Sequence, residues 1–417
     1  MIRLARFLRT RRWAACALAL FAAPPGGAGA QAHLLVRSEP GTPVVAMEVL
    51  VAAGPADEAP EQAGLAYLTA RAATAPVRPI LDSLGARLTV QAYKDALSFT
   101  LIAAPDTWNA ASRTLLVALF RDPADSVATL RERGAIRAEL VGREASPADA
   151  LAREVDAAVF GPDHPWGRPA VGYSSTVETL TVTDVDNFLR TYLVPERSVV
   201  AVMGPVDEAR TRDHLGVFFT GGSWRIPEAA PPTPLESAVR RDYNSITTWI
   251  AASYRFPVDA DEEAIRLLAD LAVEGLSFDP SRRSVYNARS EVLRRIGGGE
   301  LRLQIVVPPG EVEAWAPRLH AAIARYAEQP LAPSMLADRV RRHRGRRLRE
   351  LDTPEARAQA AARGLLLGRV PSARLAELER LNADRLQAAA RLLGEPTLVF
   401  LGPFLDSSDS STRASTR

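Results

Sequence analysis

The sequence is nearly devoid of thiols and poor in imidazoles. Cysteine occurs once in 417 residues, and Cys16 lies in an N-terminal segment that we expect to be cleaved. The mature chain can therefore form no disulfide and has no thiol chemistry. Histidine occurs five times, and no two histidines are spaced to share one face of a helix. Lysine occurs only at Lys94, and all other basic residues are arginine, a bias typical of a genome's base composition.

The net charge excludes a second group of functions. The formal charge is +2, but it includes five arginines of the N-terminal segment, so the mature chain is near −3. A protein that binds nucleic acid through its general charge is basic, and this chain is not. P-loop, Rossmann and Ser/His/Asp signatures are also missing. With 47% hydrophobic and 24% charged residues, the composition is that of a globular protein with two or three domains.

The first 32 residues have the three parts of a secretory signal peptide. Residues 1–12 carry arginines and no acid, residues 13–23 are apolar, and Ala28-Gly29-Ala30 offers a cleavage site. The apolar run is too short to cross a bilayer, so we expect no membrane span after the signal is removed. We therefore expect the mature protein in the periplasm of a Gram-negative bacterium, or secreted.

Two units of similar layout follow this leader. In each, an apolar strand leads into a helix, more helices follow, and a last apolar strand ends in Gly-Pro. The two endings, Gly204-Pro205 and Gly402-Pro403, lie 198 residues apart and indicate an internal duplication. The pattern predicts an α+β protein of two homologous domains, each a mostly antiparallel sheet with helices packed on one face. The predicted parts are domains at 33–222 and 241–405, a proline-rich linker at 223–240 and a disordered tail at 406–417.

The stretch from Val49 to Ala75 organises the first unit. An apolar run passes through a Gly-Pro-Ala-Asp-Glu turn into an Ala/Leu-rich segment, which predicts a strand, a loop and a helix. Up to Ala66 it resembles the pitrilysin/insulinase family of zinc peptidases, which includes the mitochondrial processing peptidases and the core proteins of respiratory complexes. The family helix continues with His-x-x-Glu-His. In this chain the two histidine positions and the glutamate position are held by Tyr67, Arg71 and Ala70.

The resemblance thus implies a peptidase fold from which the chemistry has been removed. Zinc hydrolysis needs three protein ligands, an open position for water and a general base. Arg71 cannot be a ligand, because its guanidinium stays protonated. We expect no catalytic residue and no metal in this chain, and zinc only in a partner.

The family's third zinc ligand lies on a later helix, in a pattern that Glu132-Arg133 and Glu139 fit. The resemblance places Glu139 at the ligand position and Glu132 in a supporting position. Carboxylates retained without zinc would be costly buried charges unless a cation compensates them. We hypothesise that Arg71 fills the vacated metal cavity and pairs with Glu139. The alternative is that both side chains point to solvent as ordinary helical charges.

Two segments are candidates for holding a peptide. Leu88, Thr89 and Val90 match a family strand whose edge accepts the substrate as an added strand. A plain structural strand explains the same residues equally well. In the second unit, family members carry an Arg and a Tyr seven residues apart, but these positions fall on Ser290 and Gly297. Arg289 could serve after a shift of one position, yet no tyrosine follows it.

Three functions remain open on the sequence alone. The first is a noncatalytic, zinc-less subunit that pairs as a heterodimer with an active zinc-peptidase homologue and helps to hold unfolded peptides, since one chain of this length is half of a family chamber. The second is a stand-alone peptide-binding or scaffold protein, a homodimer of the same fold. The third is an active metallopeptidase with an unrecognised site.

Overall fold

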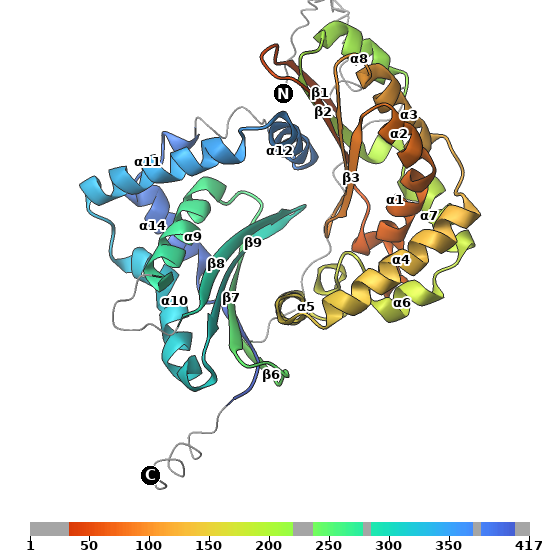
Figure 1. Ribbon diagram of the computed structural model, residues 1–417. Coiled ribbons are helices and arrows are strands. Elements are labelled where there is room, and N and C mark those ends of the chain that lie inside the picture. The colour runs from red at the N-terminus through yellow and green to blue at the C-terminus, as the bar shows by residue number, and fades with distance from the viewer. Residues whose placement is uncertain (1–32, 220–236, 278–284, 370–376, 405–417) are drawn as a thin grey trace, which may run out of the picture.

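The computed structural model describes residues 33–219, 237–277, 285–369 and 377–404. The predicted signal peptide, the tail and most of the predicted linker lie outside the described residues. Two five-stranded sheets, one in each half of the chain, form the centre of the fold, and helices surround them (Figure 1). The predicted α+β class with two related halves is confirmed.

The first sheet has the strand order β1-β5-β2-β4-β3. Only β1 and β5 run parallel, and all other neighbours are antiparallel. The strands are β1 (Leu34–Ser38), β2 (Val45–Val51), β3 (Arg87–Ala92), β4 (Leu97–Ala103) and β5 (Ser198–Gly204). The predicted peptide-binding residues 88–90 therefore lie on an edge strand, β3.

The second sheet repeats this arrangement strand for strand, in the order β6-β10-β7-β9-β8. Its parallel pair is β6 with β10, at the position of β1 with β5. The strands are β6 (Ala238–Arg241), β7 (Thr248–Pro257), β8 (Asn287–Arg295), β9 (Gly298–Val307) and β10 (Thr397–Leu401). The identical topology explains the two Gly-Pro endings that mark the repeat in the sequence.

Gly204 and Gly402 occupy equivalent, sterically closed positions. Their φ angles are 151° and 145°, a region that side chains disfavour. A Cβ at Gly204 would lie 2.7 Å from the Cα of Val45, and one at Gly402 would lie 2.9 Å from the Cα of Thr248. Glycine is therefore required where each final strand leaves the sheet beside its central strand.

Helices of each half cover one face of their own sheet (Figure 1). In the first half they are α1 (Leu65–Thr74), α2 (Arg78–Ser83), α3 (Trp108–Phe120), α4 (Ser126–Glu144), α6 (Ser174–Thr179), α7 (Val182–Tyr192) and α8 (Glu208–Gly216). In the second half they are α9 (Glu262–Ser277), α10 (Val312–Glu328), α11 (Pro333–Glu350) and α14 (Ala383–Leu393). Among the described residues, no helix combines the length and the apolarity that a bilayer span requires.

The two halves exchange one helix each, which the sequence did not predict. Helix α12 (Pro354–Leu366) packs on β2 and β5 of the first sheet, and α5 (Pro147–Phe160) packs on β7 and β10 of the second. Small residues such as Ala358 and Ala361 let α12 approach the sheet closely. Strands β2 and β5 are consequently buried along their whole length. Apart from Glu48 and the first residue of β5, Ser198, their sequences are continuous apolar runs rather than alternating patterns.

The exchanged helix α12 covers a buried carboxyl group on the central strand β2. Glu48 is 1% exposed and accepts hydrogen bonds from the hydroxyls of Ser98 and Thr100. Gln359 of α12 donates to the same Thr100 hydroxyl at 3.1 Å. Burial raises the pKa of Glu48 to about 7, and the two hydroxyl donors only partly oppose that shift. The junction between the halves therefore contains an acid that is largely protonated below neutrality.

Glu48→Gln is expected to change the pH dependence of unfolding. In the folded protein the pKa of Glu48 is near 7, above its ordinary value of 4.5. The contribution of Glu48 to the free energy of unfolding is therefore complete below pH 4.5 and is lost as the pH rises through 7. Across that window the wild type should lose about 3 kcal/mol of unfolding free energy relative to Glu48→Gln. Urea unfolding of both proteins at pH 4.5 and 8 measures the difference. The exposed substitution Glu178→Gln is the control, and parallel wild-type and Glu48→Gln curves would contradict the prediction.

Candidate functional site

The helix that carries the degenerate motif begins at a tightly fixed turn. Gly64 caps α1 with a φ of 99°, and a Cβ there would lie 2.8 Å from the carbonyl oxygen of Val171. The buried carboxylate of Glu58 accepts hydrogen bonds from the backbone N–H groups of Gly64 and Ala66, at 3.1 and 2.7 Å. These two bonds satisfy donors that the first helical turn leaves unpaired. The register of Tyr67, Ala70 and Arg71 on the helix is fixed by this cap.

Arg71 turns inward and forms the centre of the site. Its Nη2 lies 2.6 Å and its Nε 2.9 Å from Oε2 of Glu132, and its Nη1 lies 3.7 Å from Oε2 of Glu139. The same Nη1 donates to the hydroxyl of Tyr67 at 3.1 Å. The guanidinium therefore contacts both carboxylates of the predicted ligand pattern, and the closer partner is Glu132.

The two carboxylates come from one face of α4, seven residues apart. The side chain of Glu132 is 9% exposed, that of Arg71 is 19% exposed, and that of Glu139 is 47% exposed. Burial opposes the charge of Arg71, but Tyr67 and Glu132 outweigh it and raise the pKa of the guanidinium. Ala70, where the sequence resemblance implies a general base, is fully buried and supplies no polar group.

The site has no donor set for a metal. An arginine stands between the two glutamates, and guanidinium nitrogens are not ligands. Within the described ranges, no group of three or more His, Cys, Asp or Glu residues is placed to hold a metal ion. The arrangement can bind and orient charged or polar groups, but it offers no general base beside a metal-bound water.

The edge strand β3 offers backbone groups for pairing. Tyr93 N donates to Ala96 O in the turn between β3 and β4, at 2.8 Å. In an antiparallel ladder the direction of the backbone groups alternates, so Leu88, Val90 and Ala92 direct their N–H and C=O groups away from β4. Of the predicted peptide-binding residues, Leu88 and Val90 thus face the open edge, whereas Thr89 is bonded to β4.

Arg289 lies elsewhere. It is on β8, the edge strand of the second sheet, where its Nε donates to Oε1 of Gln304 at 2.6 Å. The preceding part of the compared motif, residues 281–283, lies outside the described residues. The structure therefore brings Tyr67, Arg71, Glu132 and Glu139 together and does not join Arg289 to them.

The second half carries a similar two-helix site with its charges exchanged. In the first half α1 provides Tyr67 and Arg71, and α4 provides the glutamates. In the second half α9 provides Glu263 and Asp270, whereas α11 provides His343 and Arg347. His343 lies 2.7 Å from Asp270 and 3.4 Å from Glu263 through its two ring nitrogens, and Arg347 lies 3.2 Å from Glu263.

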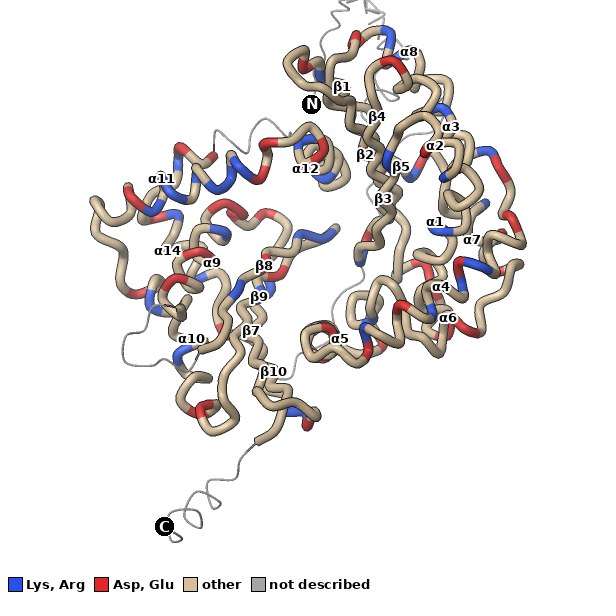
Figure 2. Tube along the Cα trace, in the orientation of Figure 1, with Lys and Arg blue, Asp and Glu red and all other residues tan. Residues whose placement is uncertain are grey.

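Acidic partners neutralise much of the arginine-rich helix α11. Burial opposes protonation of His343, but Asp270 and Glu263 outweigh it and raise the pKa of the imidazole. Arg339 and Arg346 pair with acids of α9, and basic and acidic residues intermingle along the two helices (Figure 2). The charge run of α11 therefore serves contacts within this half of the protein.

Lys94 forms an ion-pair network that sequence reasoning missed. It follows β3, and its Nζ lies 2.7 Å from Oδ2 of Asp156 on α5, while Arg302 of β9 lies 2.7 Å from the other oxygen of Asp156. Arg302 also pairs with the buried Glu300 at 2.7 Å. Burial lowers the pKa of Lys94, and the attraction of Asp156 only partly restores it. The one available signal in the sequence was a single lysine in a chain that otherwise uses arginine.

Comparison with known proteins gives partial sequence relatives. No family model matches the sequence. An uncharacterized zinc protease of Mycobacterium leprae is 39% identical over 105 residues, which are 24% of this chain and 22% of that protein. One of Mycobacterium tuberculosis strain H37Rv is 42% identical over 96 residues, or 22% of each chain. The chain thus covers about a fifth of the length of the curated relatives it matches.

Solved structures are similar over most of the chain. A peptidase M16 inactive domain from Pseudomonas fluorescens has a TM-score of 0.78 at 14% identity and covers 89% of this chain and 95% of its own. A protease from Helicobacter pylori has a TM-score of 0.76 at 17% identity, with coverages of 89% and 96%. A chain of complex III2 from Candida albicans has a TM-score of 0.74 at 14% identity, with coverages of 88% and 93%.

The chain has the M16 peptidase fold. This is the pitrilysin/insulinase fold that the sequence resemblance implied, so that prediction is confirmed. Arg71 lies on helix α1, which follows the central strand β2. The sequence resemblance implies that this position corresponds to a zinc-binding histidine of the peptidases. Of the two similar bacterial structures, one is a protease and the other an inactive domain.

Arg71→Ala is expected to lower the free energy of unfolding by about 3 kcal/mol, because it leaves the Glu132 carboxylate buried without its cation. In a Glu132→Gln background the same substitution should cost much less. Urea unfolding of the four proteins gives the coupling energy. Additive effects would contradict the pairing, and Glu139→Gln, at the more exposed carboxylate, is the control that should couple weakly.

Lys94 is expected to titrate below its ordinary pKa of 10.5. Because it is the only lysine, a chain grown with 13C-labelled lysine gives one side-chain NMR signal, whose shift against pH reports this amine alone. Asp156→Asn should lower the midpoint further, since it removes the anion that favours the charged form. A midpoint at or above 10.5 in the wild type would contradict the prediction.

Proposed function

We propose that this M16-fold chain is a noncatalytic subunit that pairs with a zinc-bearing M16 homologue and helps to hold unfolded peptides in the chamber between them. The observation that carries the proposal is Arg71, whose guanidinium binds Glu132 and Glu139 at the place of a zinc-binding residue. A cation built into the protein compensates the retained carboxylates and leaves no position for water activation.

The open edge of β3 supports the peptide-holding part of the proposal. Leu88, Val90 and Ala92 direct their backbone groups away from β4, so an extended peptide could bind there by strand addition. This form of binding uses main-chain hydrogen bonds and requires no catalytic group. A subunit can thus retain peptide binding after hydrolysis is lost.

A scaffold role is the second candidate. It is favoured by the likeness to a chain of complex III2, an assembly in which the same fold occurs. In that case the partner would be a second copy of this chain. The proposed location for either role is the periplasm or the exterior of a Gram-negative bacterium, which rests on the predicted signal peptide alone.

The test is metal content and peptide hydrolysis of the purified mature chain, alone and mixed with an M16 homologue from the same genome that retains His-x-x-Glu-His. Alone, the chain should contain no stoichiometric zinc and hydrolyse no unfolded peptide. In the mixture, a one-to-one complex should form and hydrolysis should exceed that of the homologue alone. Light scattering after size exclusion measures the complex.

Two results would overturn the proposal in different ways. Stoichiometric zinc with hydrolysis by the chain alone would establish an active peptidase with an unrecognised site. Self-association with no effect on the homologue would instead establish the scaffold role. Val90→Pro, which removes one outward N–H of β3 while sparing the ladder to β4, should weaken the stimulation without preventing assembly.

A further inference from the structure

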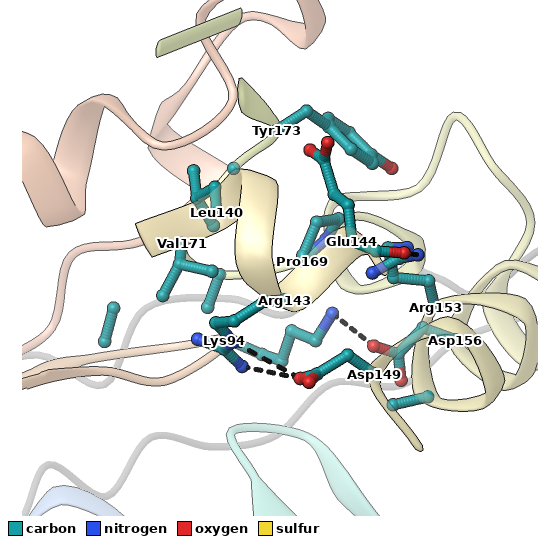
Figure 3. Close-up of a pocket in the computed structure, with 14 residues that line it drawn as sticks. Lys94, Leu140, Arg143, Glu144, Asp149, Arg153, Asp156, Pro169, Val171 and Tyr173 are labelled. Carbon is teal, nitrogen blue, oxygen red and sulfur yellow. Dashed lines mark hydrogen bonds and ion pairs between the residues drawn. The ribbon is translucent and has the colours of Figure 1, made fainter. Parts of the chain in front are cut away.

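A pocket of about 230 Å³ lies where β3 ends, between α4, α5 and the loop that precedes α6 (Figure 3). One wall is apolar and consists of Ala92 of β3, Leu140 of α4 and Val171 of the loop. Lys94 and Asp156 line the pocket at the junction of the two halves. The pocket is thus adjacent to the open edge of β3. Its lining does not include Arg71 or the residues that Arg71 contacts.

The ions at the junction satisfy one another. Lys94 pairs with Asp156 at 2.7 Å and also donates to the carbonyl oxygen of Arg168. The second oxygen of Asp156 is bound by Arg302 at 2.7 Å. Asp156 therefore has a cation on each oxygen before any ligand enters.

The acids at the rim of the pocket are also occupied. Asp149 pairs with Arg143 at 3.0 Å, and both oxygens of Glu144 accept hydrogen bonds from Ser174 at 2.9 Å. Counted over the lining, three cations face three carboxylates, so the formal charge is zero. An uncharged guest disturbs none of these pairs.

The geometry of β3 determines which peptide residue would reach the pocket. Leu88, Val90 and Ala92 pack their side chains toward the helix-covered core, and the same residues direct their backbone groups to the open edge. Two residues that lie directly opposite each other on neighbouring strands place their side chains on the same face of the sheet. The peptide residue opposite Ala92 would therefore point to the side on which the pocket lies.

We infer that this pocket receives one apolar side chain of an extended peptide bound along β3, and that Lys94 closes it to basic side chains by occupying Asp156. The inference rests on the proposed peptide-holding function and adds a substrate preference to it. To reach Asp156, a basic guest would have to displace Lys94, and Glu144 already accepts two hydrogen bonds from Ser174. An acidic guest would meet the carboxylates of Asp149, Glu144 and Asp156. The remaining cation of the lining, Arg153, already donates to the carbonyl oxygen of Glu144 at 3.3 Å.

The sole lysine makes the pocket directly observable. The probes are fluorescein-labelled Ser/Thr peptides that differ in one central residue, which is Leu, Arg or Asp. The wild type should bind the Leu peptide about tenfold more tightly than the other two, a ratio equal to about 1.4 kcal/mol. In the 13C-lysine-labelled chain, the Leu peptide should shift the single Lys94 signal.

Two variants separate the role of Lys94 from the shape of the pocket. Lys94→Met keeps most of the stem but leaves Asp156 with Arg302 alone, so affinity for the Arg peptide should rise by about tenfold. Ala152→Phe, on the α5 wall, should fill the pocket and weaken the Leu peptide while the Arg and Asp peptides change little. Ala138→Phe is the matched control, because Ala138 lies on the exposed face of α4 outside the pocket.

The outcomes distinguish this inference from the proposed function. If no peptide binds the wild type, peptide holding itself fails and the inference fails with it. A second outcome is that Val90→Pro weakens peptide binding, but the Leu, Arg and Asp peptides bind equally well and the Lys94 NMR signal does not shift. In that case peptide binding at β3 is supported and the pocket assignment is overturned. Preference for Leu, a shifted Lys94 signal and a gain of Arg affinity in Lys94→Met together would establish it.

Discussion

The exchange of α5 and α12 between the two sheets is the constraint on which the rest of the structure depends. Each sheet has helices of its own half on one face, and the other half supplies the helix on the second face. Neither half can bury both faces of its central strands alone. Because burial of apolar surface is the main stabilising contribution to folding, the two domains of the M16 fold are coupled by their cores rather than by a polar interface.

This coupling explains why ionisable groups gather at the junction. Glu48 lies under α12, and Lys94, Asp156 and Arg302 link the β3–β4 turn, α5 and the second sheet. Buried charges are costly unless each is matched, and Arg302 of the second half matches Asp156 of the first half. The same holds for Asp95, whose carboxylate accepts the backbone N–H of Ile296 at 2.7 Å. The relative placement of the halves is thus specified by partners that exist only when both are folded.

The sequence predicted the class and the duplication, because apolar patterning and the Gly-Pro endings are local properties. The resemblance to the family's motifs also pointed to Arg71 and the two glutamates, and helical spacing puts Glu132 and Glu139 on one face. The choice of Glu132 as the nearer partner depends on how α4 crosses α1, which no local pattern encodes. The exchange of α5 and α12 could not be predicted either, because the pattern of an amphipathic segment such as 354–366 does not determine which sheet the helix packs on. Lys94 was noticed only as a rarity, since its partners lie on α5 and β9.

Two cations carry the proposed function and the inferred guest preference of this M16-fold chain. Arg71 joins α1 to Glu132 and Glu139 of α4, where the sequence resemblance implies a lost zinc site. Lys94 holds the carboxylate beside the pocket at the end of β3, so that acid is unavailable to an incoming cation. Each is a positive side chain of the protein that pairs with a buried or half-buried acid near the β3 edge of the first sheet. The proposed loss of hydrolysis and the inferred choice of peptide side chain would then have the same physical origin, because in both places a cation of the protein neutralises an acid of the protein.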